Sequence, residues 1–148
     1  MLNFVDGAPF ASGRAKYSTH DAEASEGSVK IFVRIVSDAL EGPILAQLDT
    51  GAAWSVLNTE IARELGLLPG GGEVARLSTR LGWIDGRLER ATISIVADEG
   101  TSVDIDATVF VSADWQGGTF LGYSGLLERI RFAVDPNPQA SFFYFGYY

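Results

Sequence analysis

The 148-residue chain contains no cysteine and a single histidine, His20. Without cysteine there is neither a disulfide nor a thiolate metal site. Because the only histidine lies in a polar N-terminal stretch, neither a zinc site nor a histidine-based triad is expected. Positive charge is also scarce, because 11 Lys and Arg stand against 19 Asp and Glu, a net charge of −8. An acidic chain is a poor match for nucleic-acid phosphates or an anionic membrane surface. We therefore expect no nucleic-acid partner and no membrane partner.

Long hydrophobic runs are missing as well. No apolar run reaches bilayer length, and the residues after Met1 show no signal-peptide pattern. A cytoplasmic location is therefore favoured. The length predicts one domain with a sizeable core, which we place at residues 29–148, after an N-terminal arm of mixed character at residues 1–28.

Alternation of apolar and polar residues predicts strands through most of the chain after the arm. Residues 29–36 are the clearest case, with apolar side chains on one face and basic ones on the other. Two short helices are expected between strands: residues 59–65 after the cap Asn58, and residues 125–129 after the cap Ser124. These patterns predict an all-β, closed barrel-like domain with two short helices.

Asp49-Thr50-Gly51 interrupts one of the apolar segments, which then resumes through Trp54 and Leu57. A strand that opens for one tight loop has this pattern. Thr50 can hydrogen-bond backbone across the loop, and Gly51 permits close approach and positive φ. Rigid strands often present reactive groups on such loops, so Asp49 is a candidate catalytic residue. The same three residues are also ordinary in surface turns.

A second stretch, Phe120-Leu121-Gly122, ends an apolar run in a glycine before a helical segment. In this order, with a hairpin between them, the two stretches resemble the retropepsin-like (retroviral-type) aspartic peptidases, over roughly Val29 to Gly146. The resemblance implies the retropepsin (acid protease) fold and cleavage of a peptide or protein substrate. It implies no metal and no organic cofactor.

Peptide hydrolysis by aspartates needs two carboxylates that share one proton. The chain has one Asp-Thr-Gly and no second Asp-Thr-Gly or Asp-Ser-Gly. The resemblance implies a homodimeric aspartic endopeptidase in which each chain supplies Asp49, Thr50 and Gly51 as catalytic residues. One alternative is a retropepsin-like domain used for binding or dimerisation, with weak or no catalysis. Another is a β-barrel binding module in which Asp49 is only a turn residue.

The resemblance also implies substrate-binding residues after the motif glycine and near the tip of the intervening hairpin, which is the flap of the family. These candidates are Ala52, Ala53, Trp54, Gly82, Trp83 and Ile84. The hairpin is expected to turn between Gly82 and Gly86, where Asp85-Gly86 favours a tight turn, and to be mobile. Packing of Trp83 on its own sheet, or a contact of Trp83 in an oligomer, is an alternative to the flap role. Trp54 fits a specificity pocket and the core equally.

Two positions depart from the viral pattern. The viral enzymes have an Asp two residues after the motif glycine and an Arg just after the late glycine, and the two form an ion pair near the dimer contact. Here these positions hold Ala53 and Tyr123, so no buried charge is left unpaired but the dimer contact must differ. Residues 142–145, all aromatic, are a candidate part of that contact if they form an exposed terminal edge strand. Alternatively, they complete the barrel within one chain.

Asp104 and Asp106 are the remaining candidates for a metal pair. Residues 103–111 alternate along their whole length, which places both carboxylates on the polar face of a strand. Solvated surface is the better interpretation, and no metal site is expected.

Overall fold

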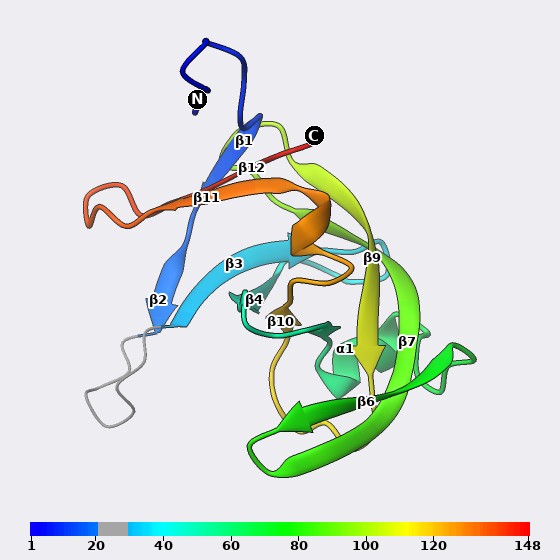
Figure 1. Cartoon of the computed structure of the whole chain (residues 1–148). Coiled ribbons are helices and arrows are strands. Elements are labelled where there is room, and N and C mark those ends of the chain that lie inside the picture. Colours follow the sequence, from blue (N-terminus) through cyan, green and yellow to red (C-terminus); the bar gives the residue numbers. More distant parts are fainter. Residues whose placement is uncertain (21–29) are drawn as a thin grey trace.

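The structure is a computed structural model that describes residues 1–20 and 30–148. Figure 1 shows its elements, which are strands of varied length with little helix. In chain order they are β1 (Gly13–Lys16), β2 (Ser18–His20), β3 (Lys30–Val36), β4 (Ile44–Leu48), β5 (Ser55–Val56), α1 (Thr59–Glu64), β6 (Glu73–Thr79), β7 (Gly82–Ile95), β8 (Glu99–Gly100), β9 (Val103–Val111), β10 (Phe120–Leu121), the 3-10 turn η1 (Leu127–Arg129), β11 (Arg131–Asp135) and β12 (Phe142–Gly146).

The larger sheet closes on itself. Its eight strands run in the order β2-β3-β4-β10-β5-β9-β7-β6, and β3 also pairs with β7 through Ile35 to Ile95 and Val36 to Ser94. This extra pairing joins β3, β4, β10, β5, β9 and β7 into a ring, which removes their free edges. The prediction of an all-β, closed barrel-like domain is therefore confirmed.

Strand β9 carries much of the core of this ring. Its inward residues are buried: Val103, Ile105, Ala107 and Val109. Asp104 and Asp106 face outward as the alternation predicts, where the hydroxyl of Ser94 donates to Asp104 and Arg90 forms an ion pair with Asp106. Within the described ranges, no group of three or more His, Asp, Glu or Cys side chains could hold a metal ion.

The two short helical segments are present, but only the first has its predicted cap. Asn58 caps α1, because its side chain accepts the backbone N–H groups of the first turn. The prediction that Ser124 caps the second helix is wrong, since Leu126 occupies the cap position of η1 without a side-chain hydrogen bond. Ser124 instead continues the extended chain, where it forms a parallel bridge with Trp54.

The C-terminal aromatic run lies inside the second sheet, whose strand order is β11-β12-β1-β8. Strand β12 pairs with β11 on one side and with β1 on the other, and Phe143 and Phe145 are fully buried. The run is therefore not an exposed edge, and the interpretation that it completes the fold within one chain is the right one. Strands β1 and β2 show that part of the expected arm pairs with β12 and β3. The boundary at residue 28 lies outside the described residues, so the two-part division stays a prediction.

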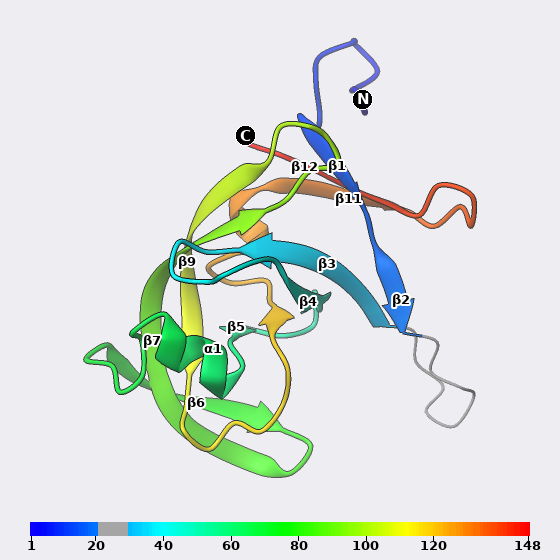
Figure 2. The ribbon, with the colours of Figure 1, turned by 180° about the vertical axis from the view of Figure 1, so that it is seen from behind.

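The elements form three levels. Figure 1 shows β11, β12 and β1 at the top, β3, β4 and β10 in the middle, and the β6–β7 hairpin at the bottom, and Figure 2 shows the same order from behind. The ends of β4 and β10 therefore lie between the second sheet and the hairpin. No helix in residues 1–20 or 30–148 combines the length and apolar character that a membrane crossing requires.

Asp98 ties the second sheet to the barrel. Its carboxylate accepts the backbone N–H of Lys16 in β1 (2.7 Å) and forms an ion pair with Arg34 of β3. The hydrogen bond from Lys16, followed by the interaction with Arg34, lowers the pKa of Asp98 below its ordinary value. The charged carboxylate therefore stabilises the folded state.

This lowered pKa gives the stability of the fold a defined pH dependence. The stabilisation is present above the unfolded-state pKa and is lost as the pH falls through the folded-state pKa. We expect Asp98→Asn to lower the free energy of unfolding by about 1 kcal/mol at neutral pH, a modest value because the pair is partly exposed. Urea unfolding curves should show this difference shrinking toward about pH 3. A difference that stays constant over that range would contradict the assignment.

Candidate active site

Asp49 stands where a pair of strands ends. Strands β4 and β10 run parallel, with Gln47 beside Phe120 and Leu48 beside Leu121. The N–H of Asp49 then donates to the carbonyl oxygen of Leu121 (3.0 Å), which extends the pairing by one residue. The position of Asp49 is thus set by two strands of the closed ring.

The loop after Asp49 folds back on its carboxylate. Oδ1 of Asp49 accepts the N–H of Gly51 (3.0 Å), and the carbonyl oxygen of Asp49 accepts the N–H of Ala52 (3.2 Å). Asp49 is half-buried, whereas Thr50 and Gly51 are exposed. These bonds hold the carboxylate in a fixed orientation at the surface of the chain.

Two expectations about this loop are not met within the single chain. The hydroxyl of Thr50 makes no hydrogen bond to any described residue, so it does not bridge the loop. Gly51 does not have a positive φ, and an added Cβ would meet only Oδ1 of Asp49 at 3.4 Å, an ordinary contact. Neither backbone strain nor crowding inside one chain explains why glycine follows Thr50.

The second motif lies directly against the first. The N–H of Tyr123 donates to the carbonyl oxygen of Ala52 (2.9 Å), and the N–H of Ser124 donates to that of Ala53 (2.9 Å). Gly122, which precedes Tyr123, is buried, and its N–H donates to Oγ of Ser55 (2.9 Å). Two stretches that are far apart in the sequence thus form one hydrogen-bonded unit around Asp49.

Gly122 is required by packing. An added Cβ would lie 2.4 Å from both the carbonyl carbon and the carbonyl oxygen of Trp54, and 2.7 Å from the nitrogen of Ser55. Real Cβ atoms essentially never approach backbone so closely. The glycine that ends the second motif therefore allows it to pack against the segment that follows the Asp49 loop.

The hairpin turns earlier than its sequence predicts. Thr79 pairs with Gly82, so the turn lies at Arg80 and Leu81, and Gly82 has φ +113°. The predicted turn at Asp85-Gly86 is wrong, because both residues lie inside β7 opposite β6. The hydroxyl of Thr79 also stabilises the actual turn by accepting the N–H of Leu81 (3.2 Å).

Gly86 has a different purpose. An added Cβ would lie 2.4 Å from the carbonyl oxygen of Val111 and 2.5 Å from the ring of Phe110. Glycine at this position therefore lets β7 approach β9 closely, which is a tertiary requirement. Asp85-Gly86 is typical of a turn in sequence, but in the structure its glycine serves the packing of two strands.

Trp83 and Ile84 lie on opposite faces of the hairpin, since successive residues of a strand alternate. Trp83 is 64% exposed, and the guanidinium of Arg76 lies 5.3 Å from its ring centroid. Arg76 also pairs with Asp85 (3.1 Å). Ile84 lies opposite Leu77 on the less exposed face. Leu77 was not among the candidates, because its pairing with Ile84 follows only once the turn is placed correctly.

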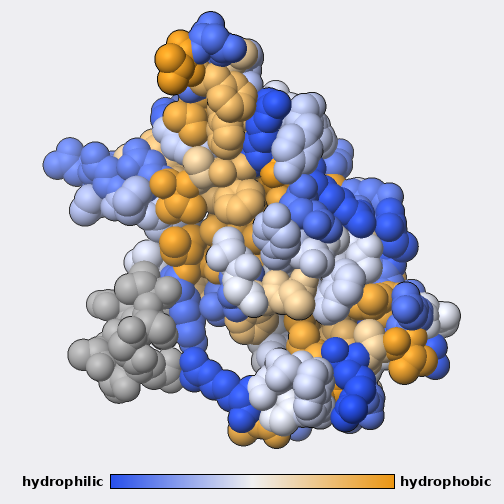
Figure 3. Space-filling model, viewed as in Figure 1, coloured by the Kyte–Doolittle hydropathy of each residue, from blue (hydrophilic) through white to orange (hydrophobic). Residues whose placement is uncertain are grey.

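The hairpin end is separated from the Asp49 loop. In Figures 1 and 2 it lies below the loop that joins β4 to β5, and Figure 3 shows an open gap between the hairpin end and the body of the molecule. No hydrogen bond or ion pair connects the two within the described ranges. The structure thus unites Asp49, the residues after it and the second motif, and it leaves Gly82, Trp83 and Ile84 apart from them.

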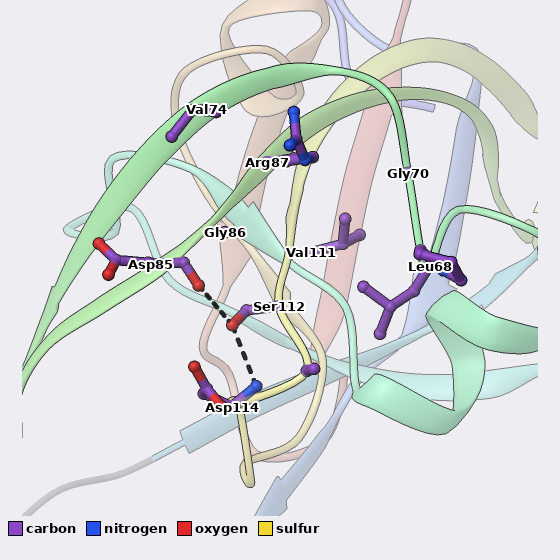
Figure 4. A pocket seen from close by; sticks show the side chains of 11 residues that line it. Leu68, Gly70, Val74, Asp85, Gly86, Arg87, Val111, Ser112 and Asp114 are labelled. Carbon is purple, nitrogen blue, oxygen red and sulfur yellow. Dashed lines mark hydrogen bonds between the residues drawn. The ribbon is translucent and has the colours of Figure 1, made fainter.

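A depression of about 320 Å³ lies at the base of the hairpin (Figure 4). Leu68, Val74 and Val111 give it apolar walls. The hydroxyl of Ser112 fixes one side by donating to the carbonyl oxygen of Asp85 (2.7 Å). None of the candidate catalytic or substrate-binding residues lines this depression, so it is separate from the Asp49 site.

Comparisons with known proteins give a likeness to a solved structure. No family model and no curated protein matches the chain. Among solved structures, one is 22% identical over 90% of this chain and 96% of its own, with a TM-score of 0.49, and it is a retropepsin-like aspartic protease from Rickettsia conorii. The chain is similar to that protein. That protein bears the name of the family that the two motifs resemble.

Proposed function

We propose that this chain is an aspartic-type endopeptidase that acts as a homodimer, with one Asp49 from each copy. The observation that carries the proposal is the placement of Asp49 at the joined ends of β4 and β10. There one carboxylate oxygen is held by the N–H of Gly51 while the loop itself is exposed. A carboxylate that is fixed and accessible in this way can be approached by the carboxylate of a second copy.

The chemistry follows from two carboxyl groups that share one proton. Two carboxyl groups held about 3 Å apart cannot both ionise, because their negative charges would repel one another. The charged carboxylate takes a proton from water as the oxygen of that water bonds to the carbonyl carbon of the substrate. The protonated carboxylate donates its proton to the carbonyl oxygen. The tetrahedral gem-diol then collapses as the carboxylate that took a proton from water gives it to the amide nitrogen and the C–N bond breaks. A hydroxyl of the gem-diol returns its proton to the other carboxylate, so that the carboxylic acid product forms and the pair again holds one proton. No cofactor is needed for any of these steps.

The second carboxylate comes from a second copy. Asp49 cannot act as base and acid in the same step, and the chain has no other Asp-Thr-Gly or Asp-Ser-Gly. Thr50, Gly51 and Ala53 are exposed around Asp49, so a partner can approach the loop. A two-fold axis through this point would place two identical loops face to face.

The peptide substrate would lie between this loop and the β6–β7 hairpin. Ile84 and Leu77 share the inner face of the hairpin and would contact apolar substrate side chains. Trp83 lies on the other face. We propose that its ring stabilises the hairpin through the cation–π contact with Arg76. Ala52, Ala53 and Trp54 would line the opposite wall, next to the carboxylates.

The hairpin should close when substrate binds. Its end has no hydrogen bond to the Asp49 loop in the described ranges, and Gly82 allows its backbone to bend. We expect amide hydrogen exchange in residues 76–84 to slow at least about tenfold when a peptide-like inhibitor is bound. The helix α1 serves as the internal control, because its exchange should not change. If the hairpin is already protected and the inhibitor alters nothing, it is not a mobile flap.

A peptide-library assay tests the proposed activity. Purified chain is incubated with the library from about pH 3 to about pH 7, since paired carboxylates work with one proton bound. We expect endoproteolytic cleavage that a pepstatin-type inhibitor blocks. A folded dimer that cleaves nothing across this range would contradict the proposal and favour a binding or dimerisation domain.

A further inference from the structure

Tyr123 is an exposed aromatic residue directly beside the Asp49 loop. Its N–H donates to the carbonyl oxygen of Ala52 (2.9 Å), and its carbonyl oxygen accepts the N–H of Glu128 (3.0 Å). Both backbone groups are therefore satisfied, and the side chain projects from a fixed base. The residue is nevertheless 50% exposed.

Tyr123 differs in this respect from the other four tyrosines of the chain. Their hydroxyl groups all form hydrogen bonds: Tyr17 with Asp135, Tyr144 with Arg14, Tyr147 with Asp104, and Tyr148 with Glu128. In residues 1–20 and 30–148, the hydroxyl of Tyr123 has no such partner, and its ring makes no aromatic or cation–π contact. Exposed tyrosines of this kind are enriched at protein interfaces.

The proposed chemistry brings a second copy to this place. Asp49 and its mate must approach to about 3 Å to share a proton. Tyr123 lies on the segment hydrogen-bonded to the loop, and such neighbouring segments are about 4.8 Å apart. A partner loop set against Asp49 therefore also covers the surface around Tyr123.

We propose that Tyr123 is a principal contact between two copies of this chain, packed against the same surface of its partner across a two-fold axis. The inference rests on the proposed function, because paired carboxylates are what require the second copy. The exposed residues of the adjoining loop are Thr50, Gly51 and Ala53, none of which is charged. Glu128, the exposed charged residue next to Tyr123, accepts the N–H of Gly125 with Oε1 (2.7 Å) in its own chain. Association at this surface therefore depends on burying aromatic and apolar groups.

The charge of the chain gives this contact a distinctive salt dependence. Each copy carries a net charge of −8, so two copies repel one another through the rest of their surfaces. Added salt screens that repulsion and weakens no ion pair at the contact. Association should thus stay constant or tighten as NaCl rises from about 50 mM to about 500 mM. A contact built on ion pairs would weaken over the same range.

Sedimentation velocity of the full chain over a concentration series gives the dissociation constant of the dimer. We expect Tyr123→Ala to raise it at least about tenfold, as loss of a central aromatic contact does. Tyr123→Phe keeps the ring and should stay within about twofold of the wild type. The control is Val5→Ala, which removes a fully exposed apolar side chain from the N-terminal segment and should change nothing. Thermal unfolding of each variant checks that the fold is retained.

The outcomes separate this inference from the proposed function. An unchanged dissociation constant in Tyr123→Ala, dissociation promoted by salt, or a wild type that is monomeric at every concentration would overturn the contact. The same series on Asp49→Asn measures association without catalysis. A dimer that depends on Tyr123 but never cleaves peptides upholds the contact and contradicts the peptidase. Cleavage by the wild type, together with an unchanged dissociation constant in Tyr123→Ala, upholds the peptidase and contradicts the contact.

Discussion

Replacing Asp49 with asparagine should lower kcat/KM for peptide cleavage by at least about a thousandfold, because neither copy can then supply the general base or the general acid. The fold should survive. Asparagine is nearly the same size, and its side-chain oxygen can still accept the N–H of Gly51 as Oδ1 of Asp49 does. Steady-state cleavage of a fluorogenic peptide and a thermal melt measure the two effects separately.

The chain offers a matched control for this substitution. Asp6 accepts the N–H of Ala8 through Oδ1 at 3.0 Å, which is the same two-residue hydrogen bond that Asp49 makes to Gly51. It lies in the N-terminal segment, far from the loop in both ribbon views. Asp6→Asn should keep full activity. Equal cleavage by the Asp49 and Asp6 variants would remove Asp49 from the mechanism.

Replacing Gly122 with alanine should have the largest effect on stability. The new Cβ would lie 2.4 Å from the backbone of Trp54, which has no flexible end that could move aside. Overpacking of this kind costs about 2–3 kcal/mol. In a chain of 148 residues this corresponds to a loss of about 5–10 °C in Tm. Because the displaced backbone leads into the Asp49 loop, we expect cleavage to fall as well.

Gly118→Ala is the control for that prediction. Gly118 lies in the loop before β10, and an added Cβ there would meet nothing within 4 Å. The variant should melt within about 1–2 °C of the wild type, since exposed substitutions rarely exceed about 0.5 kcal/mol. If both alanine variants melt like the wild type, the second motif glycine is not a packing requirement.

The parts of the fold that could be predicted are those that local pattern determines. Alternation in residues 103–111 gave the inward and outward faces of β9 correctly. Asn58 was correctly placed as a cap, because its side chain reaches the next backbone N–H groups without help from elsewhere. The two motifs were recognised by their order along the chain, and the hydrogen bonds that join them appear only in the structure.

The errors share a cause, which is contact with residues distant in the sequence. Gly86 belongs to a typical turn dipeptide, but the ring of Phe110 and the backbone of Val111 require its small size within a strand. Ser124 has the chemistry of a cap, but pairing with Trp54 keeps it extended. The run Phe142–Phe145 is hydrophobic enough to be an edge contact, and only the tertiary fold shows that it lies between two strands of its own chain.

A mixing experiment tests most directly the central claim that two copies of Asp49 form one site. Wild type is incubated with about a ninefold excess of Asp49→Asn until subunits exchange, and cleavage is measured per wild-type chain. Most wild-type chains then sit in dimers with a single carboxylate. The account predicts that activity per wild-type chain falls to about one tenth, the fraction whose partner is also wild type. Activity per wild-type chain that does not change on adding the variant would contradict it.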